Sequence, residues 1–93
     1  MLAFPNDNRS YDATRRAVRF WAHDSALECS FFVTEDALKS VAPGTQDDEA
    51  AMLSAFDSNR ACIREAASRV YARGTKGSYE LGVADLRRTA RAR

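Results

Sequence analysis

The stretch TQDDEAAMLSAFDSNRACIREAASRVYAR, residues 45–73, decides the fold. It contains neither glycine nor proline, and its apolar residues recur at spacings of three and four, which is the period of an amphipathic α-helix. Thr45 is a suitable N-cap residue, and the apolar stripe includes Met52, Phe56 and Ile63. The spacing therefore predicts one long helix whose apolar stripe covers a sheet.

Two segments before this helix, residues 17–22 and 27–33, alternate between apolar and polar side chains, as the strands of a β-hairpin do. Residues 23–26 would form a four-residue connection between them. A register with Ala22 opposite Leu27 puts the apolar side chains of both strands on one face, which favours this pairing. That face would consist of Val18, Phe20, Ala22, Leu27, Cys29, Phe31 and Val33.

The remaining segments complete a small α+β domain. A short first strand is expected before a turn at residues 12–15, and a short helix is expected to begin at the N-cap Thr34 and to end near Pro43 and Gly44. Residues 78–83 alternate again and predict a last strand. The predicted order is β-β-β-α-α-β, a small antiparallel sheet made of a hairpin or three-stranded meander plus a C-terminal strand, packed on one long and one short helix.

The length of 93 residues suits one domain with one hydrophobic core. We assign residues 1–86 to that domain. Four of the last seven residues are arginine, so residues 87–93 are expected to form a disordered or weakly helical tail.

Charge is unevenly distributed along the chain, although the net charge is only +1. Residues 34–57 contain six acids and one base, a balance of −5, whereas residues 58–93 contain nine bases and three acids, a balance of +6. The basic half could contact phosphate groups, although a solvated helix face is the more common use of such residues. The candidate contacts are Arg60, Arg64, Arg73, Arg87, Arg88, Arg91 and Arg93.

A second candidate surface comes from the polar side of the predicted hairpin. Strand alternation places Arg19, Trp21 and Phe32 on the face opposite the core. Aromatic side chains with arginine on a sheet face can stack bases or contact a protein partner. The alternative is that the short helix, residues 2–5 or a second subunit covers this face, and the exposure of Trp21 decides between these readings.

Catalytic residues are harder to find. His23 beside Asp24 could act as an acid–base pair, but the same dipeptide in a hairpin connection is more often turn chemistry. Cys29 and Cys62 have no activating neighbour and no metal-ligand spacing, and the glycines form no phosphate-binding loop. We expect no catalytic activity, no cofactor and no metal site.

The chain is also expected to be cytoplasmic and free of membrane segments. Its N-terminus lacks a basic region followed by an apolar core, and charged residues interrupt every later apolar run. In a reducing compartment Cys29 and Cys62 would be free thiols that pack as small apolar side chains.

Several short motifs resemble those of small bacterial proteins in the family called domain of unknown function 1488. The resemblance extends to about Leu86 and implies a bacterial protein with a stand-alone α+β domain. It brings no catalytic residues to this chain. The motifs are Phe4-Pro5, Ser10-Tyr11-Asp12, VRFWAHD at residues 18–24, Phe31-Phe32-Val33, Phe56, Asn59-Arg60, Ile63 and Ala67.

These observations favour a small, non-catalytic binding or protein-interaction module that self-associates or serves another protein. The first alternative is a nucleic-acid-binding accessory protein that uses the basic C-terminal half. The second is an enzyme that uses His23 and Asp24.

Overall fold

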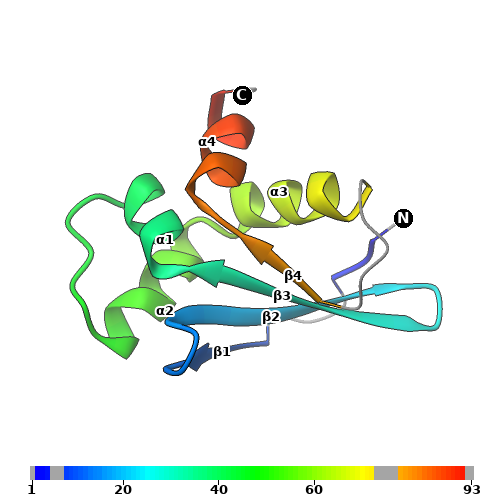
Figure 1. The fold of residues 1–93 in the computed structure, drawn as a ribbon, viewed down its shortest axis with the longest axis horizontal. Coiled ribbons are helices and arrows are strands. Elements are labelled where there is room, and N and C mark those ends of the chain that lie inside the picture. The colour runs from blue at the N-terminus through cyan, green and yellow to red at the C-terminus, as the bar shows by residue number, and fades with distance from the viewer. Residues whose placement is uncertain (1, 5–7, 73–77, 92–93) are drawn as a thin grey trace.

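The computed structural model describes residues 2–4, 8–72 and 78–91, and its elements follow the order β-β-β-α-α-α-β-α (Figure 1). The predicted α+β class is confirmed, with one more helix between the strands and one more at the end. The elements are β1 (Arg9–Asp12), β2 (Ala17–Asp24), β3 (Leu27–Thr34), α1 (Glu35–Val41), α2 (Glu49–Ser58), α3 (Arg60–Ala72), β4 (Ser78–Leu81) and α4 (Val83–Arg91).

The four strands form one mixed sheet in the order β1-β2-β3-β4. The first three are antiparallel neighbours, as the predicted meander requires, whereas β4 pairs with β3 in parallel. Our prediction of an antiparallel sheet is therefore wrong for β4. The reason is the connection: α1, α2 and α3 form a long crossover that returns the chain to the same end of the sheet, as parallel pairing requires.

The β2–β3 hairpin has the predicted faces but a different register. Ala22 pairs with Cys29 and Phe20 with Phe31, so the predicted register is wrong by two residues. Because side chains alternate with a period of two, this shift keeps every apolar residue on its face. It also shortens the connection to residues 25–26, and Leu27 lies at the hairpin tip with 67% of its surface exposed rather than in the core.

The first helix begins as predicted. The Oγ1 of Thr34 accepts a hydrogen bond from the backbone N of Ala37 at 3.1 Å, so Thr34 is the N-cap of α1. Glu35 follows and is buried, although it is charged. Its carboxylate accepts hydrogen bonds from the Tyr11 hydroxyl and from the guanidinium of Arg16, which ties α1 to β1 and to the β1–β2 turn.

The prediction of one long helix over residues 45–73 is wrong, because the chain forms two helices with a break at Asn59. Asn59 has φ −123° and ψ 23°, and its side-chain amide donates to the carbonyl of Ala55 at 2.9 Å. This bond competes with continuation of the backbone helix. The start differs as well: Asp48 caps α2, whereas the Thr45 hydroxyl donates to the carbonyl of Ala42.

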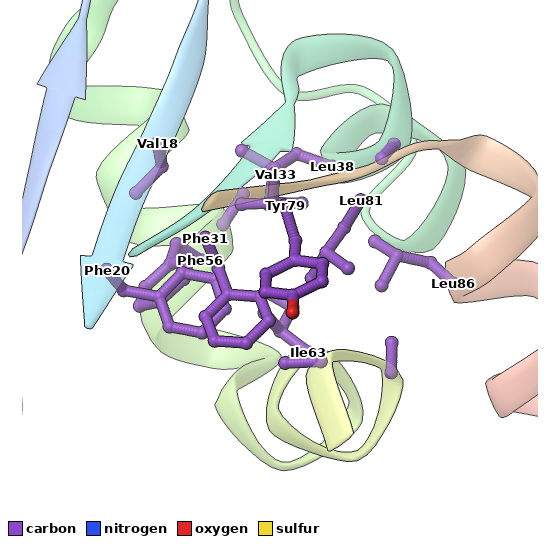
Figure 2. Close-up of a cluster of buried hydrophobic side chains, with 14 of the residues drawn as sticks. Val18, Phe20, Phe31, Val33, Leu38, Phe56, Ile63, Tyr79, Leu81 and Leu86 are labelled. Atoms are coloured by element: carbon purple, nitrogen blue, oxygen red, sulfur yellow. The ribbon is translucent and has the colours of Figure 1, made fainter. Parts of the chain in front are cut away.

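The hydrophobic core lies between one face of the sheet and the four helices. Figure 2 shows the rings of Phe20, Phe31, Phe56 and Tyr79 packed beside Ile63. Phe31 lies 5.3 Å from both Phe20 and Tyr79, measured between ring centroids. The predicted helical stripe is confirmed in this respect, because its members Met52, Phe56 and Ile63 are buried.

The C-terminal residues form a helix where we predicted a strand end and a tail. β4 ends at Leu81 and α4 begins at Val83. Leu86 and Thr89 are fully buried, and α4 contacts α1 and α3. Of the two alternatives expected for the tail, disordered or weakly helical, residues 87–91 follow the helical one, because burial of one face of α4 stabilises a helix whose Arg87 and Arg88 are exposed. Residues 92–93 lie outside the described part.

Candidate interaction surface

One face of the sheet belongs to the core and the other does not. All four helices contribute to the buried core cluster together with Phe20 and Phe31, but neither Trp21 nor Phe32 belongs to it. Leu2 and Phe4 pack against the core cluster, so these two residues do not cover the second face. We call this second face the open face and define it as Ser10, Arg19, Trp21, Ser30, Phe32, Ser78 and Glu80 of the strands, with Arg15 from the β1–β2 turn.

Arginines and aromatic rings alternate on the open face. The guanidinium of Arg15 lies 4.1 Å from the ring centroid of Phe32, and that of Arg19 lies 4.7 Å from Trp21 and 5.8 Å from Phe32. Arg19 also donates from Nη2 to the hydroxyl of Ser30 at 3.1 Å. Each such cation–π contact contributes about 0.5–1 kcal/mol at an exposed site. These contacts place both guanidiniums over the rings.

The arginines that lie over Phe32 and Trp21 reduce the exposure of both rings. Phe32 is only 7% exposed although it lies on the open face, and Trp21 is partly buried. The surface therefore presents planar guanidiniums at its centre instead of bare rings. Guanidiniums bind carboxylates and phosphates through paired hydrogen bonds, so the open face suits a partner with an acidic group opposite Arg19.

His23 and Asp24 are adjacent in β2 and therefore point to opposite faces of the sheet. The Nε2 of His23 lies 4.0 Å from a carboxylate oxygen of Glu28. Asp24 accepts a hydrogen bond from the hydroxyl of Tyr71 on α3, which lowers the pKa of Asp24 and raises the pKa of Tyr71 to about 12. The structure thus gives the two side chains different partners and does not bring them together as an acid–base pair.

The predicted basic contacts do not form one stripe in the part of the chain that the structure describes. Arg60 pairs with Asp57 at 2.8 Å and lies over Phe56, and Arg64 lies over the ring of Phe4. Cys62 lies two residues after Arg60 and two before Arg64, and it faces α4. Side chains two residues apart on an α-helix point in directions that differ by about 200°, so they lie on nearly opposite sides of the helix. Arg60 and Arg64 therefore point away from α4.

The other predicted basic contacts belong to or follow α4. Arg87 and Arg88 are exposed and line a hollow of about 510 Å³ together with Val83 and Ala84. Arg91 ends the helix. Arg73 and Arg93 lie outside the described residues.

Within the described residues no group of three or more His, Cys, Asp or Glu side chains could hold a metal ion, and no helix is long and apolar enough to cross a membrane. Cys29 and Cys62 are both buried and unbridged. Cys62 lies 4.0 Å from the carbonyl oxygen of Leu86, where it packs between α3 and α4.

Two charged residues of the open face were not predicted from the sequence. Arg15 lies in the turn before β2 and reaches Phe32 on β3, and Glu80 is the register partner of Phe32 on β4. The alternation of residues 78–83 was a usable signal for the face of Glu80, but its neighbour depends on the pairing of β4. No local pattern marks Arg15 as a residue that covers an aromatic ring.

The sequence model of the family described as "Protein of unknown function (DUF1488)" matches residues 2–82. The chain belongs to this family. A crystal structure of a DUF1488 family protein from Shewanella loihica PV-4 is similar to this chain, with a TM-score of 0.74 and 18% sequence identity over 82% of this chain and 87% of that chain. At this identity the likeness concerns the fold alone. No curated protein matches the sequence. The DUF1488 match ends one residue before α4.

Proposed function

We propose that this protein is a non-catalytic protein-interaction module that binds its partner through the open face. The observation that supports this function is the position of Trp21 and Phe32, which lie with Arg15 and Arg19 on the sheet face that the helices leave uncovered. Tryptophan and arginine are the residues that most often contribute binding energy at protein interfaces.

The side chain of Arg19 on the open face is already held in one position before a partner binds, which favours binding. Arg19 is held by the ring of Trp21 and by the hydroxyl of Ser30, so little side-chain freedom is left to lose when a partner binds. Around this centre lie the small side chains of Ser10 and Ser78, both exposed, which allow a partner to approach the sheet closely. The face thus combines ordered anchors with an accessible rim.

A photo-crosslinking amino acid placed at Ser10 or Ser78 tests this function in cells. We expect each position to form crosslinks to protein, and we expect Trp21→Ala to remove them. The matched control places the same amino acid at Ser68, which is exposed on α3 on the helical side. Equal crosslinking from Ser68, or none from either open-face position, would contradict the proposal.

Nucleic-acid binding is the second candidate, and it is favoured by the two adjacent exposed arginines of α4 beside the hollow at Val83 and Ala84. Fluorescence anisotropy with labelled single- and double-stranded oligonucleotides over a salt series tests it. Binding that weakens with salt, and a salt slope that falls in an Arg87→Ser, Arg88→Ser variant, would support this candidate. An unchanged slope in the variant would reject it.

We also propose that the protein works in the bacterial cytoplasm. The structurally similar protein comes from a bacterium, which supports a bacterial origin for this chain. Two thiols without a disulfide suit a reducing compartment such as the cytoplasm. Cell fractionation with an antibody to the protein tests the location, and recovery from the periplasm would contradict it.

A further inference from the structure

We infer that the partner of the open face is a second copy of this chain, related to the first by a two-fold axis that lies parallel to β3 just above Phe32. The inference rests on the proposed function, because it needs the open face to be the binding surface. It is carried by the order of side chains across the sheet, which makes the face complementary to itself when the axis runs along β3.

The first row of side chains crosses three strands. Arg19 on β2 is the register partner of Phe32 on β3, and Phe32 is the partner of Glu80 on β4. Neighbouring strands lie about 4.8 Å apart, so Arg19 and Glu80 stand at equal distances on either side of Phe32. The row therefore has a positive end and a negative end with an aromatic ring at its centre.

A two-fold axis parallel to β3, above this row, exchanges its ends. When a second copy faces the first across such an axis, each Arg19 lies opposite the Glu80 of the other copy. Both ion pairs form at once, because a two-fold interface uses the same patch on both subunits. The opposite charges supply electrostatic complementarity, which specifies this register over others.

The next row is complementary in size. Trp21 on β2 pairs with Ser30 on β3, and Ser30 pairs with Ser78 on β4. The same axis places each Trp21 over the Ser78 of the other copy, where the small side chain leaves room for the indole. The large residue thus meets the small one in the second row while the cation meets the anion in the first.

Arg15 and the ends of the sheet are compatible with this arrangement. The axis would bring the Arg15 side chains of the two copies near each other above Phe32. The Arg15 side chain is 53% exposed and lies 4.0 Å from Asp12, so it can turn toward solvent and toward that carboxylate. His23 and its register partner Glu28 lie on the same side of the sheet at its hairpin end, and the axis would place Glu28 opposite its own copy. Twisted sheets that pack face to face diverge at their ends, so the hairpin tips and these like charges need not touch.

Charge reversal tests the pairing directly. Sedimentation velocity of the full chain should give twice the chain mass for the wild type and monomers for Arg19→Glu and for Glu80→Arg alone. An equimolar mixture of the two variants should form a heterodimer. In that heterodimer the introduced carboxylate faces the introduced guanidinium, and the unchanged Arg19 of one variant faces the unchanged Glu80 of the other. Glu49→Arg, at an exposed acid on α2, is the matched control and should remain a dimer.

A steric variant keeps the test valid if Arg19→Glu fails to fold. Ser78→Trp changes an exposed strand residue, and it should give a folded monomer because it fills the place of the partner's Trp21. A monomeric wild type, a mixture that stays monomeric, or a dimeric Ser78→Trp variant would each overturn the inference. If the wild type is monomeric while open-face crosslinks to another protein persist, the inference fails and the proposed function stands. Absence of all open-face crosslinks rejects both.

Discussion

Ile63 is the largest fully buried side chain that α3 contributes to the core, where it lies near Phe31 and Phe56 (Figure 2). Ile63→Ala should lower the free energy of unfolding by about 2–5 kcal/mol, because it removes buried methyl and methylene groups and leaves a cavity. Urea denaturation measures the change. Ser68→Ala, on the exposed side of the same helix, should change stability by less than about 0.5 kcal/mol. A loss below about 1 kcal/mol at Ile63 would mean that the site collapses or that α3 is rotated.

The hydrogen bond from Tyr71 to Asp24 makes stability depend on alkaline pH. It raises the pKa of Tyr71 to about 12, so the folded state holds this proton more tightly than the unfolded state, whose tyrosines titrate near pH ~10. The stabilisation is complete below that unfolded value and is lost as the pH rises toward 12. Absorbance titration of the phenolate should show Asp24→Asn shifting one tyrosine toward the ordinary range. Identical titration curves for the two proteins would exclude the coupling.

At the residue scale, the sequence was sufficient to predict on which side of a strand or helix a residue lies, because that depends only on a local period of two or about 3.6 residues. Arg19, Trp21 and Phe32 could be placed on one side of the hairpin because strand alternation is local. Glu80 and Arg15 could not be added, since the neighbour of Glu80 depends on how a distant strand pairs, and Arg15 reaches its ring through the path of a turn. Contacts of that kind are set by the tertiary fold.

The helix α4 lies outside the residues that match the family model, but its Leu86 belongs to the hydrophobic core. Leu86→Ala should therefore destabilise the protein by about 2–5 kcal/mol, as much as a substitution in α3. Arg88→Ala, exposed on the same helix, should cost less than about 0.5 kcal/mol. Thermal or urea denaturation compares the two variants. Equal, small effects would show that α4 is only loosely attached.

The boundaries of elements were harder to predict than their existence. The break at Asn59 depends on a side-chain hydrogen bond to the carbonyl of Ala55. An asparagine within an apolar helical pattern does not by itself predict such a bond. The helical character of residues 83–91 was hidden by arginines, although Leu86 and Thr89 stand three apart on one face. The spacing of three between Leu86 and Thr89 was the sequence signal that could have predicted α4.

For the whole molecule, one core cluster joins the sheet to all four helices, so unfolding should be cooperative. Trp21, the only tryptophan, reports on the sheet, whereas far-ultraviolet circular dichroism reports mainly on the helices. At one protein concentration, both signals should follow the same urea transition. Separate transitions would indicate that the helices can detach from the sheet, in conflict with a shared core.

The overall architecture was predictable in class but not in sheet topology. The alternation of residues 17–33 and the helical period of residues 45–73 were enough for an α+β domain with a meander. Whether the last strand runs parallel or antiparallel depends on the path of the intervening helices, and no local pattern reports that path. The mixed sheet therefore emerges only when all elements pack together.

The parallel pairing of β3 with β4 also sets the order of events during synthesis. The β1–β3 meander joins neighbouring segments and can assemble once residues 9–34 have left the ribosome. Tyr79 and Leu81 arrive only after three helices, so closing the sheet requires a long loop with its entropic cost. While the ribosome is still adding those residues, β3 is an uncovered edge strand. The nascent chain is therefore most prone to aggregation in the interval before Ser78–Leu81 can pair with β3.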